Sequence, residues 1–343
     1  MNLITREHLV LFVFSFAVLF GPAFALFDTY DYDMEANPDI ETYLGLAEFD
    51  FEQSPVRRYR VIIPFIASGI NAVCNPVFSA IKPNTYTAPD FSLCMSFLLV
   101  NSFFMALFGV LVYRLTKAFG ATTLGAIVGL LSVLTCRWTA YIAGIPCVDS
   151  LYLVVAALML LGIREQKPSL LIICIFLGPW AKESFIFLAP LIFFFAPIKY
   201  WKQTVYFLIS GVLVFTFRFL FDYFNGFSGT ESLSKDLSHF DEIGYSLRRL
   251  FSFHGAYEVF SIVGFWGALF LLMFKKEVRM AVKNVTPLYV ILYMGIVLLH
   301  ALLSTELARM FYLATPVVAV WLATIFTHQQ RWLVGEQAST PEG

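Results

Sequence analysis

Nine acidic side chains and three arginines lie close together in one segment near the amino terminus. The acids fall within residues 28–52, and Arg57, Arg58 and Arg60 follow them. A carboxylate can take the proton of an attacking hydroxyl, which accelerates a transfer reaction by roughly 10²–10⁴-fold. An arginine can hold a phosphate through paired N–H donors, although Arg60 has a simpler alternative role as a side chain that snorkels to the membrane interface. The segment is therefore a candidate for group-transfer chemistry that needs a base and an anion site.

Within this segment, Asp39 occupies the position that the sequence defines best. It follows Asn37-Pro38 and precedes IETYLGLAEF, so we expect it to cap the start of a short helix. A capping carboxylate at the membrane surface is a fixed and partly desolvated acceptor, which suits a general base. A purely structural cap is the alternative. Asp31 and Asp33 form a D-x-D pattern in the same segment.

Three later places carry charged residues beside apolar runs. Lys182 and Glu183 lie in a break between two such runs, Asp149 begins another, and Glu306 precedes Arg309 by three residues. Ionisable groups at the bilayer centre cost roughly 2.5–3.5 kcal/mol each, less near the interface, so they call for partners or a function. Each place also has a structural alternative: a solvated ion pair at 182–183, a helix cap at 149, and an i,i+3 ion pair at 306–309.

The order of these pieces resembles the GT-C superfamily of multi-span glycosyltransferases, which use polyprenyl-phosphate-linked sugars. Two similar motifs lie in the first segment, D-x-x-x-Y-L-x-x-A (Asp39, Tyr43, Leu44, Ala47) and R-x-x-x-P (Arg60, Pro64). Two more lie further along the chain, Trp180-Ala181-Lys182-Glu183-Ser184 and Glu306-Leu307-Ala308-Arg309 before Pro316. They resemble the family's K-E-[ST] element and its late E-x-x-R.

The resemblance implies an inverting hexosyl- or pentosyltransferase that moves a sugar from a polyprenyl-phosphate donor to a lipid, glycan or protein acceptor. It assigns the general base to one loop aspartate, Asp39, Asp33 or Asp31. The donor phosphate would be held by basic residues, Arg309, Arg60 and Lys182. The cavity would be supported by four further residues, Glu183, Glu306, Tyr43 and Asp149. Whether a metal is required stays open; Mg²⁺ or Mn²⁺ would bind at Asp31 and Asp33.

The composition requires that membrane-spanning helices position these residues. The 343 residues are 59% hydrophobic and only 14% charged, whereas soluble domains are about 25% charged. The net charge of −1 gives no basic character that would indicate a nucleic-acid partner. We expect a single all-α transmembrane domain over 1–328 with about ten spans. The apolar runs that we expect to span the membrane are 9–27, 91–113, 118–136, 139–163, 168–181, 184–197, 201–221, 256–274, 286–303 and 309–327.

Residues 62–81 decide the orientation. Pro64, Asn71, Asn75 and Pro76 would be costly against lipid, so we expect an interfacial or re-entrant helix on the outer face. Twelve basic and five acidic residues then lie inside, as the positive-inside rule requires. Both termini are then cytoplasmic, 28–90 and 222–255 are outer loops, and 329–343 is a polar cytoplasmic tail. The lack of large loops favours a bacterial inner membrane.

Two other classes of function fit parts of the pattern. A transporter or flippase of lipid-linked or small solutes would place its charged sites near the bilayer midplane, often in two matching halves. A non-catalytic assembly protein of a glycan pathway would need no base. At the outer end of span 201–221, Arg218 and Asp222 are spaced i,i+4 and are expected to form a structural ion pair.

Overall fold

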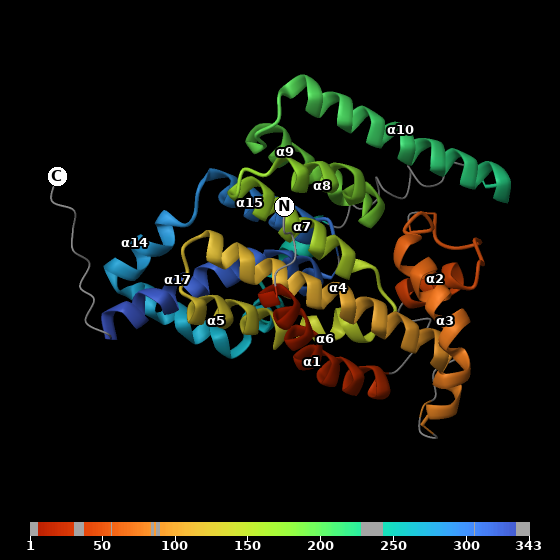
Figure 1. Ribbon diagram of the computed structural model, residues 1–343, viewed down its shortest axis with the longest axis horizontal. Helices are drawn as coiled ribbons and strands as arrows, with labels where there is room; N and C mark the ends of the chain where they lie inside the picture. The colour runs from red at the N-terminus through yellow and green to blue at the C-terminus, as the bar shows by residue number, and fades with distance from the viewer. Residues whose placement is uncertain are drawn as a thin grey trace.

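The computed structural model describes residues 6–30, 38–55, 57–83, 86, 90–227, 243–304 and 306–333, and the regular structure of these residues is helical throughout (Figure 1). The first helices are α1 (Arg6–Thr29), α2 (Pro38–Ala47), α3 (Ile62–Ile81), α4 (Phe91–Ala118), α5 (Thr123–Leu134), α6 (Arg137–Gly144), α7 (Asp149–Arg164), α8 (Pro168–Ala181), η1 (Glu183–Phe187), α9 (Ala189–Phe195) and α10 (Tyr200–Asn225). The remaining ones are α12 (Ile243–Leu250), α13 (Phe253–Val263), η3 (Gly264–Phe274), α14 (Lys276–Asn284), α15 (Leu288–Leu302), α16 (Leu307–Phe311), η4 (Tyr312–Ala314) and α17 (Thr315–Leu333).

The helices have the length and composition of an all-α polytopic membrane protein. In the described part of the chain, six are long and apolar enough to cross a membrane, or up to eight if each bent pair is one span. The described helices therefore support six to eight spans, and the expectation of about ten stays a prediction. Several of the expected spans are short or broken: α7 has 16 residues, α8 has 14, and 184–197 divides into η1 and α9.

The expected span 139–163 is interrupted, and this break positions part of the site. The chain leaves helix after Gly144, Pro146 follows, and α7 begins only at Asp149. Proline lacks an N–H and disfavours helix at the residue before it. Buried Asn101 of α4 donates to the carbonyl oxygens of Ile145 and Cys147, both at 3.1 Å, so the broken backbone keeps its hydrogen bonds. α6 instead continues α5, with a bend of 58°.

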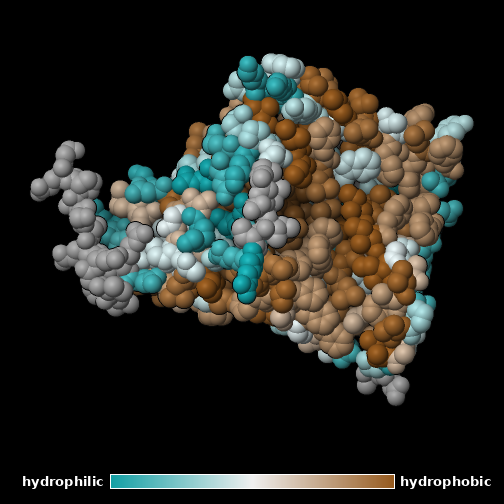
Figure 2. Space-filling model, in the orientation of Figure 1, coloured by the Kyte–Doolittle hydropathy of each residue, from teal (hydrophilic) through white to brown (hydrophobic). Residues whose placement is uncertain are grey.

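The bundle separates into buried central helices and peripheral ones. About 78% of the apolar window of α4, and of the window spanning α16 and α17, is buried, against 6% for α10. Buried α4 packs against α1, α3 and α7. Figure 2 shows the resulting brown hydrophobic surface, bordered on both sides by hydrophilic residues. Since water would oppose such an exposed apolar belt, its natural surrounding is lipid.

α2 and α3 lie at one end of the molecule, and α14 lies at the other (Figure 1). α3 runs across the direction of α4 and α10, although it is apolar enough to be one of the six candidate spans. α14 carries Lys276, Arg279 and Lys283 and buries Val278 and Val282. The segments assigned to the outer and inner faces therefore lie at opposite ends. The side of the membrane that each end faces stays a prediction.

Candidate functional site

Arg309 is the centre of a buried set of ion pairs. It lies on the short helix α16, and its side chain is only 5% exposed. Its Nε donates to Asp149 Oδ2 at 2.6 Å, and its Nη1 donates to Glu306 Oε2 at 2.7 Å and to Asp39 Oδ2. One guanidinium thus contacts three carboxylates. Burial of so much charge is tolerated only because each group has a partner of opposite sign.

Asp149 connects Arg309 to a second cation. It opens α7 directly after the break, where the helix dipole favours a negative charge. Its Oδ1 accepts a hydrogen bond from Lys182 Nζ at 2.9 Å, while Oδ2 accepts from Arg309. Ser150 donates to Asn101 Oδ1 at 2.6 Å, which ties the start of α7 to α4. The break between α6 and α7 and the hydrogen bonds of Asn101 therefore hold this carboxylate in place.

Asp39 lies in the first turn of α2, and both of its oxygens contact arginines. Oδ2 accepts from Arg309, and Oδ1 forms an ion pair with Arg57 Nε. Burial alone would raise the pKa of this carboxyl, but the positive charges of Arg309, Arg57 and Arg60 outweigh it and lower the pKa. Asp39 is therefore ionised at neutral pH and able to accept a proton, although the arginines weaken it as a base.

Arg60 organises the second half of the site. Its Nε donates to Glu183 Oε2 at 2.9 Å, its Nη2 donates to Glu183 Oε1, and its Nη1 donates to Tyr43 Oη at 2.8 Å. The bidentate pair fixes the guanidinium plane. Burial raises the pKa of Tyr43, so its hydroxyl stays protonated. Tyr43 lies one helical turn after Asp39, and Glu183 directly follows Lys182 in the chain. The same two segments therefore contribute residues to both halves of the site.

We call this assembly the ionic network; it comprises four acids and four bases together with Tyr43. Its charged members come from five segments and are Asp39, Arg57, Arg60, Asp149, Lys182, Glu183, Glu306 and Arg309. Every sequence-predicted site residue within the described part of the chain belongs to it. Asp31 and Asp33 lie outside the described residues. The opposite charges balance, which lets so many ionisable groups meet at one place.

Arg57 is a member of the network that sequence reasoning did not assign to the site. It lies in the run Arg57-Arg58-Tyr59-Arg60, and only its spacing of three residues from Arg60 could have indicated a shared direction. Arg57 and Arg60 contact the network, whereas Tyr59 donates to Asp222 of α10. This turn thus directs neighbouring side chains either to the ionic network or to α10.

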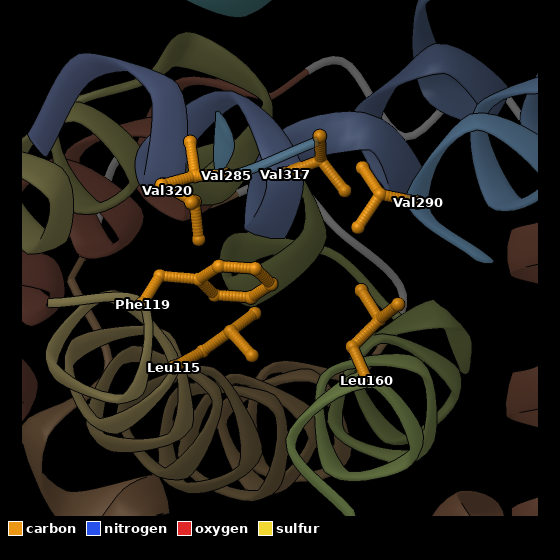
Figure 3. Close-up of a pocket in the computed structure, with 7 residues that line it drawn as sticks. All are labelled: Leu115, Phe119, Leu160, Val285, Val290, Val317 and Val320. Atoms are coloured by element: carbon orange, nitrogen blue, oxygen red, sulfur yellow. The ribbon is translucent and has the colours of Figure 1, made fainter. Parts of the chain in front are cut away.

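A small cavity adjoins the network. Its lining includes Asp149, Lys182, Arg309, Tyr152 and Tyr312, and its volume is about 10 Å³, which is room for about one water molecule. This volume is too small for a sugar. A second cavity, shown in Figure 3, is lined only by apolar side chains and offers no group for chemistry.

No group of three His, Cys, Asp or Glu side chains that could hold a metal ion occurs among the residues the structure describes. The carboxylates of the ionic network are instead paired with arginine and lysine. The D-x-D aspartates, to which a metal was assigned, lie outside the described residues. Metal dependence therefore stays open.

Comparisons of the chain with protein-family models, with curated proteins and with solved structures give no match.

Proposed function

We propose that the ionic network is the active site of a glycosyltransferase that takes its sugar from a polyprenyl-phosphate donor. The observation that carries this proposal is the meeting of Asp39, Arg60, Lys182 and Arg309 in one buried place. They come from four separate segments, and the sequence motifs assign a role to each of them. A base and an anion site are the two groups that such a transfer requires.

In the proposed reaction, the acceptor hydroxyl oxygen bonds to the anomeric carbon as the bond from that carbon to the phosphate oxygen breaks. The electron pair of the broken bond leaves with the polyprenyl phosphate, and the hydroxyl proton passes to Asp39. The displacement inverts the anomeric carbon. Atoms and charge balance without a further reactant, and the acceptor is a lipid, glycan or protein hydroxyl.

Arg309 offers a way to couple donor binding to the strength of the base. Its most exposed partner is Glu306, whose side chain is 46% exposed, and this carboxylate is the one that a donor phosphate would displace most easily. A phosphate on Arg309 would also draw positive charge away from Asp39. The pKa of Asp39 would then rise toward a value that suits a general base.

The proposal includes a GT-C-like arrangement of the helices. If α7, α8, the η1–α9 pair and α15 each complete a crossing, the bundle has about ten, and α3 stays at the outer face. The ionic network then lies at the outer or periplasmic end of a bacterial inner-membrane protein, and both termini lie in the cytoplasm. A divalent cation, Mg²⁺ or Mn²⁺, held by Asp31 and Asp33 is part of the proposal only if turnover requires it.

The test is transfer in reconstituted liposomes. Full-length protein receives a panel of undecaprenyl-phosphate-linked hexoses and pentoses with a membrane lipid extract as the source of acceptor. Release of undecaprenyl phosphate is followed for wild type, Asp39→Asn and Asp33→Asn, with and without EDTA. The matched control is Glu258→Gln, because Glu258 is an arginine-paired carboxylate outside the network.

We expect Asp39→Asn to lower turnover by roughly 10²–10⁴-fold, the loss typical of a general base, and Glu258→Gln to stay within about twofold of wild type. Full turnover in Asp39→Asn with loss in Asp33→Asn would move the base to the D-x-D pattern. No turnover with any donor, together with movement of the intact lipid across the bilayer, would replace the enzyme by a flippase. The absence of both would favour the assembly protein.

A further inference from the structure

A second charged cluster lies beside the ionic network, between the turn at 57–60 and the end of α10. It consists of Arg58, Tyr59, Arg218 and Asp222, and we call it the Tyr59 cluster. The Tyr59 hydroxyl donates to both carboxylate oxygens of Asp222, at 2.9 and 2.8 Å. Burial and then the hydrogen bond to Asp222 raise the pKa of Tyr59 to about 12, so the phenol remains a donor at neutral pH.

Several N–H groups of the two arginines in this cluster have no hydrogen-bond partner among the residues that the structure describes. Arg58 is only 2% exposed, yet its Nε and Nη2 have no hydrogen-bond partner in the described structure. The Nε of half-buried Arg218 is in the same state. The guanidinium of Arg58 instead stacks on Phe227 at 4.3 Å, and that of Arg218 lies 4.6 Å from the centre of the Tyr59 ring. Nearly all buried polar groups in proteins are hydrogen-bonded, so these free donors call for an acceptor.

The charge balance also separates this cluster from its neighbour. The ionic network has four acids for four bases, whereas among the residues that the structure describes the Tyr59 cluster has only Asp222 for Arg58 and Arg218. Asp222 pairs with Tyr59, and the expected ion pair with Arg218 does not form although the two residues are spaced i,i+4. One positive charge and several N–H donors are left over. Such a combination binds an anion, and the guanidinium geometry suits phosphate.

The surroundings of Arg218 indicate that the anion is carried by a lipid. α10 is a peripheral long helix, with only 6% of its apolar window buried, and Figure 2 shows hydrophobic surface where α10 runs in Figure 1. Phe215 is 71% exposed and precedes Arg218 by three residues, so the two share one side of the helix. Tyr223 and Phe224, 70% and 77% exposed, mark the end of this apolar surface. An acyl or polyprenyl chain lying along α10 would bring its headgroup to Arg218.

We propose that Arg58 and Arg218 together bind the phosphate group of an anionic lipid at this end of α10. The phosphate oxygens accept hydrogen bonds from Arg218 first, because it is the more exposed arginine, and then from Arg58 when the Phe227 ring shifts. Asp222 stays bonded to Tyr59 and so does not compete with the phosphate. The site is separate from the ionic network, and lipid binding there does not depend on the proposed transfer reaction.

Native mass spectrometry of the full-length protein in neutral detergent tests this site. The protein is titrated with dioleoyl phosphatidic acid, with dioleoyl phosphatidylcholine as the zwitterionic comparison. Arg218→Gln is the main variant, because Arg218 is half-buried and its replacement leaves the core intact; Arg58→Gln and the double variant extend the series. The matched control is Arg249→Gln, an arginine that is bound to Glu258 by an ion pair of 2.5 Å.

We expect wild type to bind one phosphatidic acid at least tenfold more tightly than phosphatidylcholine. Arg218→Gln removes most of this preference, and Arg249→Gln keeps it. Equal binding of the two lipids by wild type, or equal losses in Arg218→Gln and Arg249→Gln, would overturn the site.

Two competitors identify the source of the phosphate. If undecaprenyl phosphate displaces phosphatidic acid, and Arg218→Gln weakens both, the site takes lipid-borne phosphate whichever chain carries it. If phosphatidic acid alone binds, the ligand is a bilayer phospholipid. If inorganic phosphate displaces the lipid at comparable concentration, the ligand is a soluble anion and the lipid assignment is wrong.

Discussion

Two cavities of similar volume, about 10 Å³ each, are both lined by α7, and only one of them has charged residues in its lining. α7 contributes Leu153 to the charged cavity and Leu160 to the apolar one, about 10 Å further along the helix. Leu313 lines the first and Val317 and Val320 line the second. The size of a cavity therefore does not distinguish a site here. The difference lies in what surrounds each cavity: apolar side chains at one end, and the charged groups of the ionic network at the other.

This difference matters because the two kinds of burial respond differently to substitution. An apolar cavity loses contacts roughly in proportion to the methyl groups removed. A charged network loses far more when one partner is removed, since the remaining charge stays buried and unpaired. A protein would keep such a costly arrangement for a purpose, and the proposed reaction supplies one.

The largest effect on stability is expected for Arg309→Gln. The variant leaves Asp39, Asp149 and Glu306 without their shared cation, and removal of one partner from a buried ion pair costs about 3–5 kcal/mol. The loss of stability is measured by unfolding the protein in mixed micelles as the SDS fraction is increased. A cost below about 1 kcal/mol would mean that the network is hydrated, and the contrast between the two cavities would disappear.

A loss of about 2 kcal/mol is expected for Asp39→Asn at neutral pH, because the variant loses the charged hydrogen bond to Arg309 and the ion pair with Arg57. The loss depends on pH because the pKa of Asp39 is lower in the folded protein than in the unfolded chain, where it is about 3.9. The wild-type carboxylate stabilises the fold above that value, and the benefit fades as the pH falls through the folded pKa. The gap between variant and wild type should therefore narrow below about pH 4; a constant gap would contradict the assigned charge state.

Val320→Ala tests the apolar cavity. Val320 is 3% exposed, and the two missing methyl equivalents should cost about 1.5 kcal/mol at ~0.8 kcal/mol per buried group. The same unfolding assay measures this change. The expected loss has no dependence on pH between about 3 and 7, because the groups around this cavity do not titrate. A pH-dependent loss would show that the two ends of the bundle are coupled.

The smallest stability change is expected for Glu306→Gln. The Glu306 side chain is half exposed, and pairs of this kind contribute at most about 1 kcal/mol. Its replacement should instead tighten the binding of undecaprenyl phosphate, because Arg309 loses its most displaceable partner. The affinity of wild type and of Glu306→Gln for undecaprenyl phosphate is measured by a scintillation proximity assay. Weaker binding in Glu306→Gln would show that the carboxylate supports the donor rather than competes with it.

The sequence predicted a helical membrane fold, and it singled out charged side chains that meet in the ionic network, for a common physical reason. Hydropathy and helix length are local properties, and they locate α1, α4, α8 and α10 to within a few residues, except that α4 runs five residues longer than expected. Ionisable groups beside apolar runs must find partners, which favoured the meeting of Asp149, Lys182 and Arg309.

Features that depend on contacts between distant segments were not predictable. The break before Asp149 is stabilised by Asn101, 44 residues earlier than the first carbonyl it binds. Arg218 was expected to pair with Asp222, its neighbour on the helix. Asp222 binds Tyr59 instead, which is 163 residues away. Spacing on one helix indicates which side chains can meet, but tertiary packing decides which of them do.

The most direct test of the central claim compares Asp39→Asn with Val320→Ala in one transfer assay. Both variants are placed in the same liposomes, at a temperature where circular dichroism shows each to be folded, with the undecaprenyl-phosphate donor that wild type uses. If the ionic network is the active site, turnover falls roughly 10²-fold or more in Asp39→Asn and stays at the wild-type level in Val320→Ala. Wild-type turnover in Asp39→Asn, or an equal loss in both variants, would contradict it.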